Sequence, residues 1–339
     1  MTLTQVQDRE ASNEINIRSS TAKSSAALAS QEKARKVRRR IALAVMILPT
    51  LGFVLAMVDG WNYGFSFWKI ALLIFFYVIT LFGVEAGFHR LLSHSAYVTP
   101  LRSIIVVLGS MAAQGPAIFW AAAHRQHHAF SDDIGDPHSP RPFSPGSKGF
   151  LKGLWHGHMG WLLKAENVDW ARFAPDLLKD RRLFNLNQTY MLWVLIGLIL
   201  PAILGSIFAS NLSGSTGGFW IGAWEGLLWG GLARIFLVHH AVWAVNSICH
   251  IFGSRPYQCK GTATNNLWLA LPSLGGAWHN NHHAFPSTAD NQFAWWQFDF
   301  SGIILRLLKS VQLVSNFKKP TDSAIAARRI QTTAAHIQA

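Results

Sequence analysis

Three tight groups of histidines are the residues of this chain whose types and spacing most clearly indicate chemistry. All but one of the 15 histidines fall between residues 89 and 283, and His336 is the exception. The groups are His89 and His94 in HRLLSH, His124, His127 and His128 in HRQHH, and His279, His282 and His283 in HNNHH. Imidazole is the commonest metal ligand among side chains. One such group alone is commonly a solvated or core-packed pair, whereas the three together predict a metal site.

The spacing within each group predicts how its histidines are presented. In HRQHH and HNNHH they stand at i, i+3 and i+4, which places them on one face of a helix. Residues five apart lie about 140° apart around a helix of 3.6 residues per turn. His89 and His94 can therefore reach one site only if their helix ends between them. Asn246 and His250 form a further pair at i and i+4.

With His250, the histidine groups offer more imidazoles than one ion can bind. A single ion takes about four to six ligands in tetrahedral or octahedral sites, whereas nine imidazoles are present here. The sequence therefore predicts two metal ions. Iron, zinc, copper and nickel all accept imidazole, so the spacing does not choose among them.

The elements that position these histidines belong to a chain whose solvent is a bilayer. Half of the 339 residues are hydrophobic and only 14% are charged, against about a quarter in soluble proteins. Four stretches reach the roughly 20 apolar residues that a spanning helix needs, namely 41–58, 67–84, 190–209 and 219–238. The run 103–113 is shorter, and we expect it to form a buried or interfacial helix. Glu225 and Arg234 fall inside the fourth span and should face protein or water.

The distribution of basic residues predicts the orientation. All 30 Lys and Arg lie on one side of these spans, except Lys69 and Arg234 within them, and the loops 59–66 and 210–218 contain none. Because loops rich in Lys and Arg stay in the cytoplasm, both termini and every histidine group are expected there. The same distribution accounts for the net charge of +13, so no nucleic-acid partner is predicted.

The predicted fold is an all-α integral membrane protein, in which four transmembrane helices carry a helical cytoplasmic cap that holds a dinuclear metal site. The membrane domain spans residues 41–316. Residues 1–40 form a basic segment that lacks aromatic side chains, and we expect it to be disordered. Residues 317–339 are expected to form a loose tail.

In this order and on this topology, HRLLSH, HRQHH and HNNHH resemble the boxes of the membrane fatty acyl desaturases, which include stearoyl-CoA desaturase and bacterial Δ9 enzymes. The resemblance extends over residues 41–316 and includes HGHMGWLL, NSICHIFGSRPY and WHNNHHAFP. It implies a non-haem centre of two iron ions and a reaction that uses O2 and two electrons to place a cis double bond in an acyl chain, usually at Δ9. The implied ligands are His89, His94, His124, His127, His128, His250, His279, His282 and His283, with Asn246 acting through water.

Two positions depart from the family pattern. Relatives commonly read GEGWHNNHH, whereas this chain has Gly276 in place of the glutamate. Glu85 stands where a small or hydroxyl residue is more usual. The departures concern the surroundings of the metal ligands and not the ligands themselves.

Six residues near the boxes are candidates for binding substrate or supporting the ligands: Trp120, Trp155, Trp161, Trp278, Asp136 and His158. For each tryptophan the alternative is ordinary packing in the core or at the membrane interface. Asp132 and Asp133 are equally well explained as a turn that ends a helix. His138 is expected to be structural, and His239 and His240 are expected to lie outside the site.

Two other functions remain open from the sequence. A hydroxylase of an acyl chain or alkane would use the same di-iron class, and a histidine-rich metal transporter or sensor would need no acyl substrate. For a desaturase, acyl-CoA is the expected substrate, and chains on acyl carrier protein or a lipid are the alternatives. The electrons must come from a separate donor, such as a ferredoxin or cytochrome b5 with its reductase.

Overall fold

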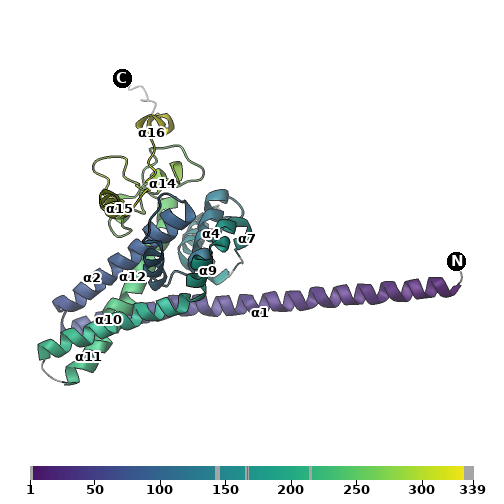
Figure 1. Cartoon of the computed structure of the whole chain (residues 1–339), viewed down its shortest axis with the longest axis horizontal. Coiled ribbons are helices and arrows are strands. Elements are labelled where there is room, and N and C mark those ends of the chain that lie inside the picture. Colours follow the sequence, from purple (N-terminus) through teal and green to yellow (C-terminus); the bar gives the residue numbers. More distant parts are fainter. Residues whose placement is uncertain (1–2, 142–145, 165, 167, 214–215, 332–339) are drawn as a thin grey trace.

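The computed structural model describes the backbone of residues 3–141, 146–164, 166, 168–213 and 216–331. It describes the side chains of the same residues apart from 3–27, 210–213 and 216–217. Over this part the regular elements are all helices, and only isolated bridges join extended segments, such as Val98 with Ser315. The helix α1 (Leu3–Tyr63) extends far from the body of the molecule (Figure 1).

Four helical segments are long and apolar enough to cross a membrane, which confirms the four predicted spans. They are Leu28–Tyr63, Phe67–Ser93, Tyr190–Ala209 and Gly218–His250. The first belongs to α1, and the second consists of α2 (Phe67–Phe82) and the π-helix η1 (Gly83–Ser93). The third belongs to α10 (Tyr190–Ser213). The fourth joins α11 (Thr216–Gly226), the π-helix η3 (Leu227–Ala233), α12 (Arg234–Ser247) and η4 (Ile248–His250).

The second and fourth segments are longer than a bilayer requires. They contain 27 and 33 residues, which at about 1.5 Å per residue is roughly 40 and 50 Å against a hydrocarbon core of about 30 Å. Both therefore continue beyond the apolar layer. His89 lies in the last part of the second segment and His250 is the last residue of the fourth, so these long helices carry candidate ligands beyond the apolar layer.

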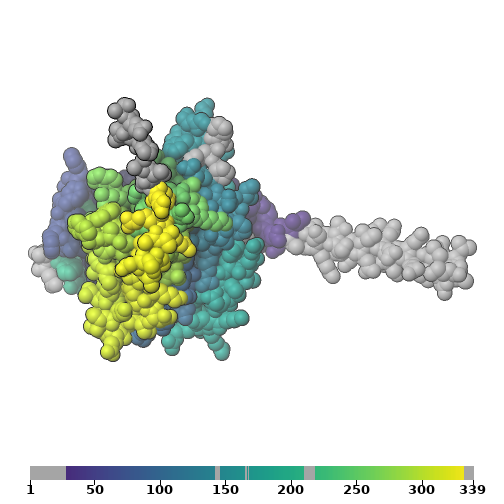
Figure 2. Space-filling model, turned by 90° about the horizontal axis from the view of Figure 1, so that it is seen from above, coloured from purple at the N-terminus to yellow at the C-terminus, as the bar shows by residue number. Residues whose placement is uncertain are grey.

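The remaining helices form a cap on the ends of these two long segments. They are α3 (Arg102–Met111), α4 (Ala117–Phe130), α5 (Gly146–Trp155), η2 (His156–Gly160), α6 (Trp161–Lys164), α7 (Trp170–Phe173), α8 (Pro175–Lys179), α9 (Arg181–Gln188), α13 (Leu267–Ala270), α14 (His279–Ala284), α15 (Phe300–Ser310) and α16 (Asp322–Arg328). In Figure 2 the C-terminal residues, in yellow, cover much of the face seen from above. The short apolar helix predicted at 103–113 corresponds to α3.

Close packing fixes the position of η1 against α3. A Cβ atom on Gly83 would lie 2.1 Å from the backbone nitrogen of Gly109, so the two backbones are in direct contact. No side chain other than hydrogen fits at that crossing. The helix that carries His89 is thereby held on α3 without a layer of intervening side chains.

The ionisable residues inside the spans face protein, as expected. Arg234 is fully buried and donates to the carbonyl oxygens of Gly230, Met111 and Gly197. The Lys69 ammonium group lies 2.8 Å from an Asp59 carboxylate oxygen and 2.5 Å from one of Glu225. This buried group joins three of the four spans.

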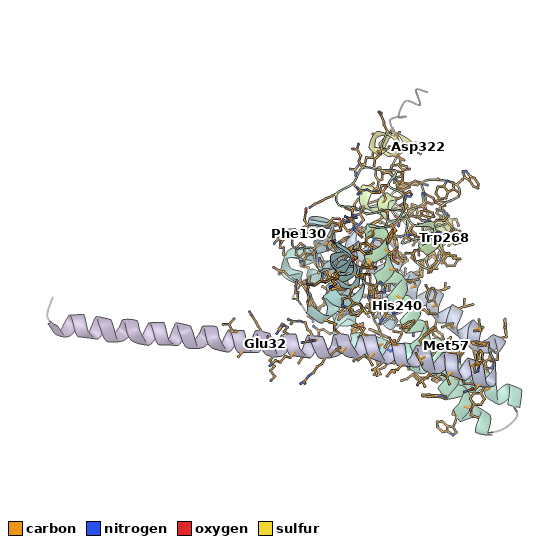
Figure 3. The ribbon with its side chains drawn as sticks, turned by 180° about the vertical axis from the view of Figure 1, so that it is seen from behind. Glu32, Met57, Phe130, His240, Trp268 and Asp322 are labelled. Carbon is orange, nitrogen blue, oxygen red and sulfur yellow. The ribbon has the colours of Figure 1, made fainter. Side chains whose placement is uncertain are left out.

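Both terminal segments are more regular than the sequence indicated. Residues 28–40, expected to be disordered, are helical and form part of α1. Their helix continues from a membrane span, so no separate nucleation is needed, and a Glu32–Arg35 ion pair lies along it. Figure 3 shows Glu32 on the projecting part of α1 and Met57 where α1 lies beside the body.

At the other end of the chain, residues 317–331 are held against the cap rather than forming a loose tail. The side chain of Ile325 packs with Tyr257 and Ala284. The backbone N–H of Ile330 donates to the Pro256 carbonyl at 2.8 Å. Residues 332–339 of the predicted tail lie outside the described residues.

Candidate metal centre

Four elements deliver the nine predicted histidine ligands to one place. His89 lies within η1 and His94 directly follows it. The HRQHH group lies in the last two turns of α4, the HNNHH group forms most of α14, and His250 is the last residue of η4. In a π-helix residues five apart are hydrogen-bond neighbours. The π winding of η1 and its end at Ser93 therefore bring His89 and His94 to the same side.

The imidazole nitrogens form two groups, in each of which all the ligand atoms lie within 4.8 Å of one another. One group is His89, His94, His124 and His282, and the other is His127, His250, His279 and His283. The ninth histidine, His128, joins them. Its Nε2 lies 3.1 Å from that of His124 and 2.9 Å from that of His282, and its ring stacks on His283.

The spacing between these nitrogens fits ions held between them. A metal–imidazole bond is about 2.0–2.1 Å, which places neighbouring ligand nitrogens about 2.9–3.4 Å apart around one ion. The His89–His282 and His94–His124 pairs are both separated by 2.9 Å between Nε2 atoms. In the second group the His250–His279 separation is 3.0 Å and the His127–His283 separation is 3.3 Å.

Three carboxylates orient the rings from outside. Asp136 lies 2.7 Å from His127 Nδ1, Asp132 lies 3.1 Å from His250 Nδ1, and Glu85 lies 3.2 Å from His89 Nδ1. A carboxylate at Nδ1 holds the proton there and leaves the Nε2 lone pair for a metal. All three Nε2 atoms point into the groups described above. The donor set thus has both the ligand atoms and the supporting partners of a metal site.

Burial and these contacts set the protonation states that ligation needs. Burial alone would raise the pKa of the Asp136 carboxyl, but the adjacent His127 lowers it by more, so the net pKa lies well below its ordinary range. The pKa of Asp132 is lowered in the same way against burial, chiefly by His250. Burial also holds the pKa values of six ring nitrogens well below their usual 6.5, those of His94, His124, His128, His279, His282 and His283. These rings are neutral at pH 7, the form that binds metals.

The centre has a solvent-facing opening. A cavity of about 440 Å³ is lined by His94, Arg125, His128, Cys259, Lys260, His283, Pro286 and Arg328. His94 and His128 are partly exposed, whereas the other seven histidines are at most 7% exposed. Cations thus surround the place where the rings are accessible from outside.

Two of the candidates for substrate contact, Trp120 and Trp161, lie near the predicted ligands. Trp120 stacks on His124 with ring centroids 5.1 Å apart. Trp161 packs against His138, which in turn lies beside His127. Trp120 is therefore in direct contact with a predicted ligand, whereas Trp161 is separated from the predicted ligand His127 by the ring of His138.

The other candidates lie further from the rings or point elsewhere. Trp278 is buried and donates its indole N–H to the Phe298 carbonyl, and Trp155 is half exposed. His158 pairs with His240 and Ser247 instead of a predicted ligand. Asn246 lies half-buried one turn before His250, and its action through water stays a prediction.

Sequence reasoning did not identify two of the supporting carboxylates. Asp132 is a turn residue with φ of 64°, as the sequence suggested, and its carboxylate is also the partner of His250. Glu85 precedes His89 by four residues, and this i, i+4 spacing was the available signal.

Comparisons with known proteins agree on one family. The model of the family described as fatty acid desaturase matches residues 77–300. The hex-5-enoyl-[acyl-carrier protein] acetylenase of Moorena producens is 40% identical over 84% of this chain and 87% of its own length. The sn-1 stearoyl-lipid 9-desaturase of Anabaena variabilis is 33% identical over 79% of this chain and 89% of its own length. The icosanoyl-CoA 5-desaturase of Limnanthes douglasii is 30% identical, over 83% and 72% respectively.

Proposed function

Because this chain belongs to the fatty acid desaturase family, we propose that it uses O2 to introduce a cis double bond, at Δ9, into a saturated fatty acyl chain. The observation that carries this proposal is the pair of imidazole groups, each close enough to hold one ion, in a chain of that family. The two ions are proposed to be iron. Bound there, iron supplies the activation of O2 that side chains cannot provide.

The electrons of this reaction balance only with an external donor. Reduction of O2 to two water molecules takes four electrons. Two leave the acyl chain with its two hydrogens, and two come from the donor together with two protons. A donor such as a ferredoxin or cytochrome b5 with its reductase would approach the basic rim of the solvent-facing cavity, where Lys260 and Arg328 lie near His94 and His128. An acidic partner is attracted to such a rim.

The protein's own residues would bind and orient. In each imidazole group the carboxylates keep the Nε2 lone pairs directed at the ion. The indole of Trp120 lies against His124 and His89, so it is proposed to form a wall of the acyl site. This apolar ring would help to exclude water from the reacting carbons.

We propose that the metal centre lies on the cytoplasmic side of the bilayer. The long second and fourth segments carry His89 and His250 past the apolar layer on the side where the basic loops lie. This argument rests on the positive-inside rule. Single cysteines introduced near Lys318 and, separately, in the loop 59–66 would test it. A reagent that cannot cross the membrane of intact cells should label the cysteine in the loop and not the one near Lys318.

The relatives differ in the carrier of the acyl chain. The relatives' names include acyl carrier protein, a stearoyl-lipid and CoA. We propose acyl-CoA as the substrate, and the same purified protein offered stearoyl groups on each of the three carriers would test this. Conversion of the lipid or carrier-protein form alone would contradict it. The acetylenase among the relatives makes an alkyne a product to seek as well.

Expression in a host without unsaturated fatty acids tests the proposed reaction. Gas chromatography of total fatty acids should show new monoenes, and mapping of the double bond should place it at Δ9. His127→Ala should abolish them, whereas Asp133→Asn, at an exposed carboxylate beside the site, should retain them. Absence of new alkenes from wild type, or their persistence in His127→Ala, would refute the proposal.

A further inference from the structure

Gly276, just before the HNNHH group, is a glycine that its backbone does not require. The neighbouring Gly275 has φ of 99°, a left-handed conformation that favours glycine. Gly276 is not among the positive-φ residues, so other residues could adopt its backbone conformation. Its lack of a side chain therefore needs another explanation.

That explanation is the carboxylate of Glu85. A Cβ atom on Gly276 would lie 2.6 Å from Glu85 Oε1, 2.9 Å from Cδ and 3.2 Å from Oε2. All three of the nearest atoms belong to the Glu85 carboxylate, which therefore occupies the space that a side chain at 276 would fill. The two residues come from different elements, η1 and the turn before α14, and are separated by most of the chain.

The same carboxylate orients one of the metal-binding rings. Glu85 is 5% exposed, and its Oε2 lies 3.2 Å from His89 Nδ1. The opposite nitrogen of His89, Nε2, lies 2.9 Å from His282 Nε2. In the other imidazole group Asp136 and Asp132 act on His127 and His250 in the corresponding way. Among the described residues, Glu85 is the one carboxylate hydrogen-bonded to a ring of the first group.

We propose that Glu85 and Gly276 form a coupled pair that positions His89. Glycine at 276 leaves room for the carboxylate of residue 85, and that carboxylate holds the proton on His89 Nδ1 so that Nε2 faces the ion. Glu85 is thus a positioning residue. The inference rests on the proposed metal centre and adds to it the device that orients His89. It predicts that the carboxylate can be supplied from either position, but not from both at once.

Variants at the two positions test this coupling through metal retention. Purified proteins are compared by metal content per chain and by the rate of metal release to a chelator. Removing a partner of a ligating histidine commonly costs about 10- to 100-fold in metal affinity. Glu85→Ala should lower metal affinity by this factor. Glu85→Gln should lower it less, because its single amide oxygen can still accept from His89 Nδ1.

The second position provides the decisive comparison. Gly276→Ala should weaken retention when Glu85 is present, because its Cβ displaces the carboxylate. In the Glu85→Ala background it should add no further loss, since nothing is left to displace. The double variant Glu85→Ala/Gly276→Glu should regain most of the metal retention that Glu85→Ala loses. Gly276→Glu alone should retain metal less well than wild type, because the two carboxylates compete for one space. Asp133→Asn is the control: it removes the charge of an exposed carboxylate near the centre, and it should retain metal as wild type does.

The outcomes separate this inference from the proposed function. Wild type that binds no metal would overturn the proposed centre and the pairing together. Wild type that binds metal while Glu85→Ala releases it equally slowly would overturn the pairing alone. An equal effect of Gly276→Ala in both backgrounds would do the same. Thermal unfolding of the metal-free proteins checks that Glu85→Gln folds as wild type does.

Discussion

Replacing Asp136 by asparagine should disable the second imidazole group while changing almost no volume. Asp136 Oδ2 lies 2.7 Å from His127 Nδ1, and both side chains are 1% exposed. The carboxylate also accepts the backbone N–H groups of Asp132 at 2.8 Å and His138 at 3.1 Å. An asparagine can keep only one oxygen for these donors. Its amide can instead present N–H groups to His127 Nδ1, which moves the ring proton to Nε2, where a metal should bind.

The magnitude follows from the role of such partners. A loss of about 10- to 100-fold in metal affinity corresponds to about 1.4–2.7 kcal/mol of binding free energy. Equilibrium dialysis against a metal buffer, followed by metal analysis of the protein, measures it. We expect Asp136→Asn to lose close to one ion per chain at a metal concentration that saturates wild type. Two ions retained with unchanged affinity would refute the assignment of Asp136 to His127.

Three further predictions concern titratable and charged side chains. Burial lowers the pKa values of imidazoles in the metal centre, such as those of His124 and His279, so below about pH 6.5 the unfolded chain binds more protons than the folded protein does. The melting temperature of the metal-free protein should therefore fall as the pH drops from 7.5 to 5, and a flat profile would contradict this. Lys260→Glu with Arg328→Glu should slow reduction by an acidic protein donor roughly tenfold at low salt, but leave reduction by dithionite unchanged. Lys69→Met should destabilise the fold by about 3–5 kcal/mol because it leaves two buried carboxylates without the cation that they share. Adding Asp59→Asn and Glu225→Gln should recover most of that loss in a denaturation assay.

The histidine spacing and the hydrophobic pattern were sufficient to predict the outline of the molecule. The i, i+3, i+4 groups placed their rings on single helix faces, and α4 and α14 present them so. The four spans also follow from the sequence, because apolar length is a local property. The sequence did not predict that the second and fourth helical segments continue past the apolar layer to His89 and His250, because the residues that form these continuations mix polar and apolar side chains.

The surroundings of the imidazoles could not be predicted because they depend on tertiary contacts. Glu85 and Gly276 meet across nearly 200 positions of the chain, and in the sequence each departure stood alone. The π winding of η1 has no known local code, although it decides how His94 meets His89. The C-terminal segment is held by backbone bonds to Pro256 and Gln258, which composition does not reveal.

A reaction of the purified, iron-loaded protein with stearoyl substrate, an electron donor and isotopically labelled O2 tests the central claim most directly. Mass spectrometry of the acyl product should show a chain that has lost two hydrogens and carries no labelled oxygen, with the label recovered in water. An acyl chain containing labelled oxygen would assign a hydroxylase instead. O2 consumption without any change in the acyl chain would contradict the account altogether.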